Sequence, residues 1–141
     1  MQSNRVRDFV IRELVTVEPT TPIVEVARQM SSQRLGSAIV VEDGNLVGIL
    51  TERDIVRVVA EGADPEKTTA ADYMSRQVAT IRADEEMAEA ARVMISEQIR
   101  HLPVVENEQL LGVLSIRNIV QWSVRQSPDE GRHLPQLMDL V

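Results

Sequence analysis

Apolar and polar positions along the chain change their period several times, and the changes follow a fixed order. Short apolar runs at 15–17, 38–41 and 46–50 have the length of strands, and the polar segment 42–45 between the last two is typical of a hairpin turn. Apolar residues spaced three and four apart over 22–33 and 52–60 predict amphipathic helices. The first half of the chain is therefore predicted to fold as β-α-β-β-α.

The second half repeats this series, with strands expected at 80–81, 102–105 and 110–114 and helices at 85–98 and 116–125. Residues 8–56 align with 72–120 at a constant offset of 64 and without a gap. Such an internal repeat indicates one structural unit built twice. We therefore predict an α/β (α+β) fold of two β-α-β-β-α motifs packed as a pseudo-two-fold pair. Because each motif is small, we expect the two to share one core.

Turn and helix-capping residues set the expected boundaries of the motifs and of their first helices. We assign 1–64 to the first motif, 65–126 to the second, and 127–141 to a C-terminal tail that forms a short helix. Thr21 is expected to cap the first helix, with Pro22 at its first position, and Asp84 to cap the corresponding helix of the second motif.

Composition and charge narrow the function classes. The chain has a formal net charge of −7, so it lacks the positive field that drives general nucleic-acid binding. It has no cysteine, which excludes disulfides, thiolate zinc sites and cysteine nucleophiles. No apolar run has the length of a signal peptide or of a membrane span. We expect a cytoplasmic protein that binds neither nucleic acid nor membrane.

One short motif carries candidate chemistry in both copies. A strand ends in Gly-x-x-Thr/Ser-x-x-Asp/Asn, which places Thr51 and Asp54 in the first motif and Ser115 and Asn118 in the second at the start of a helix. A carboxylate can accept hydrogen bonds from the vicinal hydroxyls of a ribose, a helix N-terminus suits phosphate, and the glycine permits close backbone approach. The same residues also form an ordinary helix cap, and the two roles are compatible.

Taken together, these segments resemble a tandem pair of CBS domains, the cystathionine-β-synthase motif, also called a Bateman module. The resemblance covers about residues 5–126. It rests on the two glycine-led segments and on five further segments: Asp8-Phe9-Val10 with Asp72-Tyr73-Met74, Val15-Thr16-Val17 with Ala79-Thr80-Ile81, and Arg100-His101-Leu102-Pro103-Val104.

The resemblance implies two clefts between the motifs that bind an adenine nucleotide such as AMP, ADP or ATP. It also implies a regulatory role toward a partner protein and a homodimer. Carried over residue by residue, it assigns Thr51, Asp54, Ser115 and Asn118 to ribose or phosphate, and Thr16 and Thr80 to the neighbourhood of adenine. It assigns Arg100 to phosphate. The apolar walls around the base are Ala38, Ile39, Ile49, Leu102, Pro103 and Val113.

Two departures from the family pattern distinguish the motifs. Asn118 stands where the family usually has aspartate, which removes the charged ribose acceptor from the second motif. Gly36 stands opposite Arg100, so the first motif lacks that phosphate arginine, and Arg53 or Arg34 are candidates to replace it. His101 is a further candidate ligand contact, although a histidine at a strand edge is also commonly just a polar surface residue.

Three function classes follow. The leading hypothesis is a non-enzymatic sensor that binds an adenine nucleotide as a regulatory ligand, has no resident cofactor or metal, and acts on an unidentified effector protein. The alternative is a structural dimerisation module without a physiological ligand. A hydrolase or transferase is the third class, but the sequence contains no motif for an activated nucleophile or a phosphate-binding loop.

Overall fold

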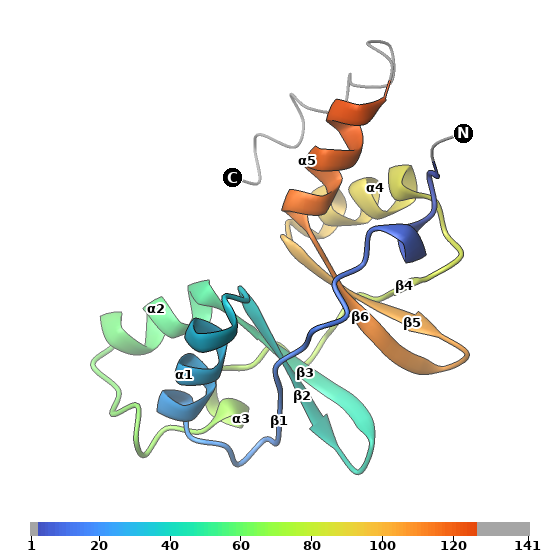
Figure 1. Cartoon of the computed structure of the whole chain (residues 1–141). Coiled ribbons are helices and arrows are strands. Elements are labelled where there is room, and N and C mark those ends of the chain that lie inside the picture. Colours follow the sequence, from blue (N-terminus) through green and yellow to red (C-terminus); the bar gives the residue numbers. More distant parts are fainter. Residues whose placement is uncertain (1–2, 127–141) are drawn as a thin grey trace. The chain divides into compact units, whose positions relative to one another are not determined.

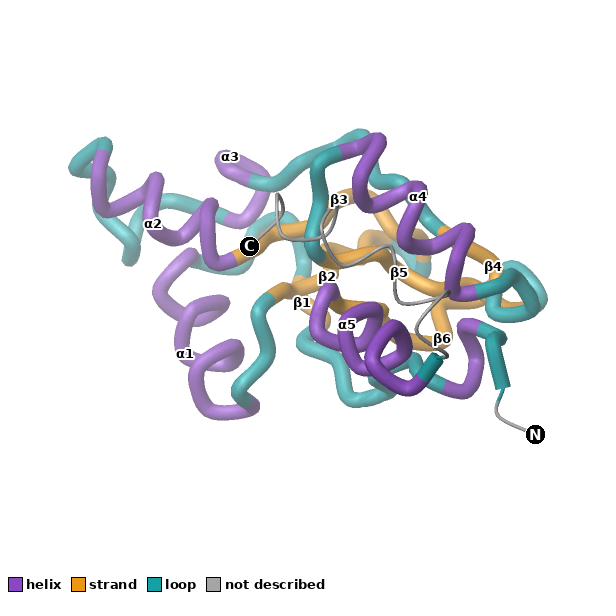
Figure 2. Tube along the Cα trace, turned by 90° about the horizontal axis from the view of Figure 1, so that it is seen from above, coloured by secondary structure: helices purple, strands orange, loops and turns teal. Residues whose placement is uncertain are grey.

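The computed structural model describes residues 3–126, and these fall into two compact units. One unit is a single stretch, 14–78, and the other joins the N-terminal residues up to Glu13 to the segment that begins at Ala79. Each unit contains one three-stranded sheet with helices packed against it (Figures 1 and 2). The tail expected to form a helix, 127–141, lies outside the described residues.

The unit of residues 14–78 confirms the predicted order of elements. Strand β1 (Thr16–Val17) leads through helix α1 (Ile23–Gln33) to the hairpin of β2 (Ser37–Glu42) and β3 (Asn45–Thr51), and helix α2 (Glu52–Ala60) follows. Strand β2 lies in the centre of the sheet, parallel to β1 and antiparallel to β3. A further short helix, α3 (Ala70–Tyr73), completes the unit.

The other unit repeats the same topology. Strand β4 (Ile81–Arg82), helix α4 (Met87–Glu97), strands β5 (His101–Glu106) and β6 (Gln109–Ser115), and helix α5 (Ile116–Arg125) follow in that order. Strand β5 is again central, parallel to β4 and antiparallel to β6. The N-terminal segment adds a 3-10 helix, η1 (Val6–Asp8), whose Val6 is fully buried.

The two hairpins share their details, including a register shift at the same aligned position, after Val40 and after Val104. Each closes with two residues at positive φ, Asp43 and Gly44 in one motif and Asn107 and Glu108 in the other. Two consecutive residues at positive φ are the signature of the type I′ turn, whose twist matches that of the strands.

Apolar residues, mostly aliphatic but including Trp122, build two separate cores rather than one shared core. One cluster lies between α1, α2 and the first sheet, and the other between α4, α5 and the second sheet, and they have no residue in common. The separation corrects the expectation of a shared core. The first contains Val15, Val17, Ile23, Val26, Met30, Ala38, Val40, Leu50, Val58, Ala70 and Met74.

Helices α1 and α4 start without the caps that the sequence predicted. The N-cap positions hold Pro22 and Glu86, and neither makes a side-chain capping bond. The first N–H groups instead donate to distant carbonyls: Ile23 to Thr68 at 2.8 Å and Met87 to Asn4 at 2.7 Å. Thr21 Oγ1 accepts the N–H of Glu18, and Asp84 pairs with Arg82. Backbone from the segments before each repeat thus replaces the side-chain caps.

These same segments cross the sheets at the motif glycines. Ile11 exchanges two backbone hydrogen bonds with Val113, both 3.0 Å, and Ser75 does the same with Ile49 at 2.9 and 3.0 Å. A Cβ on Gly112 would overlap the Ile11 carbonyl oxygen, and one on Gly48 would lie 2.5 Å from Met74 Sδ. The glycines therefore admit the chain's own backbone, whereas the sequence suggested that they admit a ligand.

Among the helices of residues 3–126, none combines the length and the apolar character that crossing a bilayer demands.

Candidate functional site

The predicted ribose residues of the first motif form a helix cap at the junction of β3 and α2. Asp54 Oδ2 accepts the backbone N–H of Thr51 at 2.9 Å and the Thr51 hydroxyl at 3.4 Å, and the pair forms a capping box. Asp54 is buried, with 7% of its surface exposed. Its other oxygen, Oδ1, accepts Arg57 Nη1 at 3.1 Å. A carboxylate offers about four acceptor positions, so one position on Oδ1 stays open.

Asn118 forms the equivalent cap between β6 and α5, with a different outcome for a ligand. Its Oδ1 accepts both the N–H of Ser115 at 2.8 Å and the Ser115 hydroxyl at 3.0 Å. Because an amide oxygen has two lone pairs, these bonds use its acceptor capacity. The Asn118 side chain can then offer only its Nδ2 donors. The two motifs therefore differ in hydrogen-bond polarity at this position, which supports the distinction drawn from the sequence.

The segment before each hairpin is tied to the start of the following helix. The N–H of Glu52 donates to the carbonyl of Gly36 at 3.2 Å, and the N–H of Ile116 donates to that of Arg100 at 2.8 Å. His101 pairs with Ser115 across β5 and β6. The structure thus brings Arg100, His101, Ser115 and Asn118 close together, and their ligand role remains a prediction. The Arg100 and Arg53 side chains are exposed.

The predicted apolar walls divide between the two faces of each sheet. Ile39 and Ile49 are cross-strand partners, as are Pro103 and Val113, and none of the four belongs to a helix-side core. Ala38 and Leu102 belong to those cores and are 0% exposed, so their side chains fill the protein interior. Successive residues of a strand face opposite ways, which explains the division.

Thr16 and Thr80 lie at the parallel strands. Thr16 pairs with Ile39, whereas Thr80 lies just before β4, whose first residue Ile81 pairs with Val104. Thr16 is exposed and lines a hollow of about 410 Å³ with walls from β1, α1 and the β2–β3 turn. Thr51 and Asp54 do not line this hollow. The corresponding hollow of the other unit, about 650 Å³, is lined by Arg7, Arg82, Ala83, Asp84, Val105, Glu106, Asn107 and Glu108.

A network around Asp54 was not predicted from the sequence. Arg57 lies between the Asp54 carboxylate and Glu61, 3.7 Å from Nε to Oε2, and its guanidinium stands over the Tyr73 ring at 5.2 Å. Tyr73 donates its hydroxyl to Glu61 at 2.8 Å, a bond that raises the pKa of Tyr73. The sequence does contain a sign of this network, because the charges of Asp54, Arg57 and Glu61 follow i,i+3 and i,i+4 spacing.

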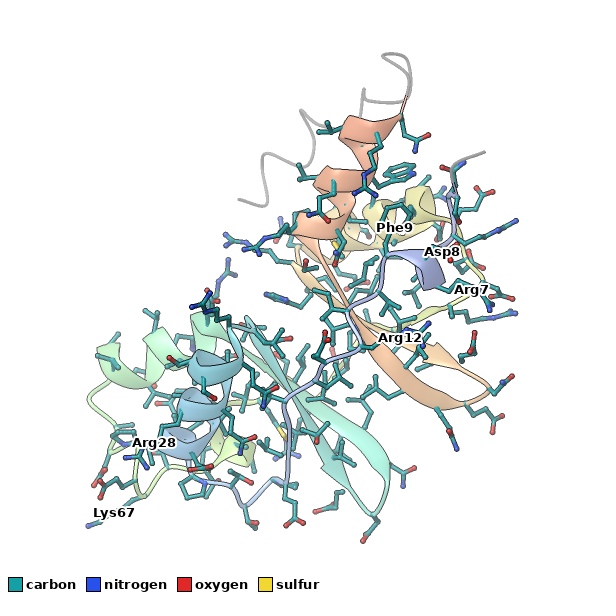
Figure 3. The ribbon with its side chains drawn as sticks, viewed as in Figure 1. Arg7, Asp8, Phe9, Arg12, Arg28 and Lys67 are labelled. Atoms are coloured by element: carbon teal, nitrogen blue, oxygen red, sulfur yellow. The ribbon has the colours of Figure 1, made fainter. Side chains whose placement is uncertain are left out.

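The other motif has no counterpart of this network at Asn118. The positions of Arg57, Glu61 and Tyr73 correspond to Gln121, Arg125 and Phe9. There the Arg125 guanidinium lies over the Phe9 ring, 6.0 Å from its centroid, on the side of the N-terminal segment that faces α5 (Figure 3). A cation–π contact to the aligned aromatic residue, Tyr73 or Phe9, is present in both units, while the link to the cap residue is lost.

Within residues 3–126, no three histidine or acidic side chains are grouped so that they could hold a metal ion.

Comparison with protein families finds the CBS domain twice, at residues 6–61 and 70–125. The CBS domain-containing protein YhcV of Bacillus subtilis is 33% identical over 115 residues, which cover 81% of each chain. An uncharacterized protein of Methanopyrus kandleri is 38% identical over 124 residues, 86% of this chain. The alignment spans 63% of that relative's length.

Among solved structures, the CBS domain pair of protein MJ0100 is similar, with a TM-score of 0.76 and 27% identity over 84% of this chain and 94% of that one. It was solved in complex with 5′-methylthioadenosine and S-adenosyl-L-methionine. Both ligands of that protein carry an adenosine group.

Proposed function

Because the chain belongs to the CBS domain family and is a CBS pair, a regulatory module, we propose that it senses an adenine nucleotide of the AMP, ADP or ATP type. The observation that carries the proposal is the Asp54 carboxylate. It is fixed by the cap with Thr51 and keeps an acceptor position for a ribose hydroxyl. The adenosine compounds bound by the similar pair support an adenosine ligand.

The first motif is the stronger ribose site in this proposal. Asp54 offers a charged acceptor, and hydrogen bonds to charged groups are stronger than neutral ones. Asn118 offers only donors, so the second motif recognises ribose less well or leaves that position unused. Arg100, exposed beside Ser115, is the proposed phosphate contact, with Arg53 as its counterpart in the first motif. The protein acts on an effector protein and performs no catalysis itself.

The test is calorimetric titration with AMP, ADP and ATP, of the wild type and of Asp54→Asn. The amide preserves the capping box, as Asn118 does naturally, but it replaces the charged Oδ1 by an NH2 group, which removes the acceptor proposed for ribose and the bond from Arg57. We expect Asp54→Asn to weaken nucleotide binding about tenfold and Asp54→Ala about 10- to 150-fold. Unchanged melting of Asp54→Asn without ligand is the control.

The alternative is a dimerisation module without a physiological ligand. It is favoured by the same geometry, because a helix cap alone explains why Thr51 and Asp54 occur together. Absence of binding by all three nucleotides would support this alternative, whereas equal affinities of wild type and Asp54→Asn would show that Asp54 is only a helix cap. A ligand-induced rise in melting temperature would exclude it.

A further inference from the structure

Arg57 occupies one of the acceptor positions of the Asp54 carboxylate, on Oδ1. Asp54 is 7% exposed, whereas the Arg57 side chain is 51% exposed. Arg57 therefore lies on the solvent side of the buried carboxylate. Oδ2 is committed to Thr51, so both the arginine and any ligand hydroxyl must use Oδ1.

A ribose offers two neighbouring hydroxyls, but Oδ1 has only one open acceptor position while Arg57 is bound. The second hydroxyl can be accommodated only if Arg57 leaves. A second acceptor is already close, because Glu61 Oε2 lies 3.7 Å from Arg57 Nε. Glu61 in turn accepts the hydroxyl of Tyr73 on α3, so the position of Arg57 and the environment of Tyr73 are coupled.

We propose that Arg57 is a positioning residue that exchanges Asp54 for Glu61 when a ribose diol binds, and that this exchange reports occupancy of the first motif to Tyr73. The proposal rests on the proposed function. It applies to one motif only, since Gln121 replaces the arginine in the other. Segment 70–78, which carries Tyr73, is also bonded to β3 through Ser75 and Ile49. The signal therefore reaches the backbone that leads into the second unit.

The first measurement compares AMP with 2′-deoxy-AMP, which lacks one of the two hydroxyls. With Arg57→Gln, Oδ1 is free for the diol, and the preference for AMP over the deoxy compound should grow about two- to fivefold. Any effect of the lost charge on phosphate cancels in this ratio. Arg28→Gln, an exposed arginine on α1, removes the same charge elsewhere in the unit and should leave the ratio unchanged (Figure 3).

The second measurement uses the one tyrosine of the chain as a reporter. With ring-labelled tyrosine, AMP should shift the nuclear magnetic resonance signal of Tyr73 in the wild type. The shift should be smaller with 2′-deoxy-AMP and absent in Arg57→Gln.

The proposal is overturned if AMP binds the wild type without shifting the Tyr73 signal and if Arg57→Gln has the same preference for AMP over 2′-deoxy-AMP as the wild type. Arg57 would then form only a surface ion pair. If none of AMP, ADP and ATP binds the wild type, the proposed function has failed and this inference fails with it. The two failures are distinguished by the wild-type titration alone.

Discussion

Glu108 adopts a backbone conformation that suits glycine. Its φ is +66°, at the position where the other hairpin has Gly44 at +79°. A left-handed conformation costs a residue with a side chain about 1–2 kcal/mol, and glycine loses about 0.5–1 kcal/mol in unfolded-chain entropy. Glu108→Gly should therefore stabilise the fold by about 0.5–1 kcal/mol in urea unfolding.

Gly44→Ala is the matched control for Glu108→Gly. A Cβ at Gly44 would meet no atom within 4 Å, so only the backbone term changes. We expect a loss of about the same size. A Glu108→Gly protein no more stable than the wild type would contradict the strain argument.

At the residue scale, the sequence predicted local pairs better than distant ones. Thr51 with Asp54, and Ser115 with Asn118, are three residues apart, and both pairs form the predicted cap. Thr21 and Asp84 look equally suitable as caps, but carbonyls of Thr68 and Asn4 take the helix N–H groups instead. These partners are distant in sequence, so a local motif does not reveal them. The ligand roles of the site residues stay predictions.

At the element scale, every strand and long helix of the two repeats was predicted, because each has its own hydrophobic period. The short helices η1 and α3 were not. Helix α3 has only four residues, and its first N–H groups are bonded to the carbonyls of Thr21 and Pro19. A helix of this length is unstable by itself, so tertiary contacts decide its existence.

The crossing of β6 by the N-terminal segment makes Gly112 the more sensitive of the two motif glycines. A Cβ there would overlap a backbone oxygen of Ile11, which is fixed by two hydrogen bonds to Val113. At Gly48 the nearest atom is Met74 Sδ, the end of a flexible side chain. Gly112→Ala should cost about 2–3 kcal/mol and Gly48→Ala about 1 kcal/mol. Urea midpoints that rank the two in the opposite order would refute this account.

At the scale of the whole molecule, the gapless offset of 64 predicted two copies of one unit, and the structure contains two matching three-stranded sheets. What the sequence did not predict is how the units divide the chain. Residues up to Glu13 were assigned to the first motif but belong to the unit of β4–β6, and 65–78 were assigned to the second motif but belong to the unit of β1–β3. The repeat is visible from the order of side chains alone. Which unit each connecting segment joins depends instead on backbone hydrogen bonds between residues distant in sequence, such as Ile11 and Val113.

We expect two copies of the chain to associate through the outer face of α2. Val56 and Val59 are 65% and 74% exposed and stand one helical turn apart, although valine is usually buried. We expect a closed two-fold dimer that covers this face, the commonest form of assembly. Light scattering at micromolar concentration should give twice the chain mass for the wild type and the monomer mass for the double variant Val56→Asp, Val59→Asp. Ser96→Asp, at an exposed position of α4, should stay dimeric. A monomeric wild type would mean that these valines are simply tolerated on the surface.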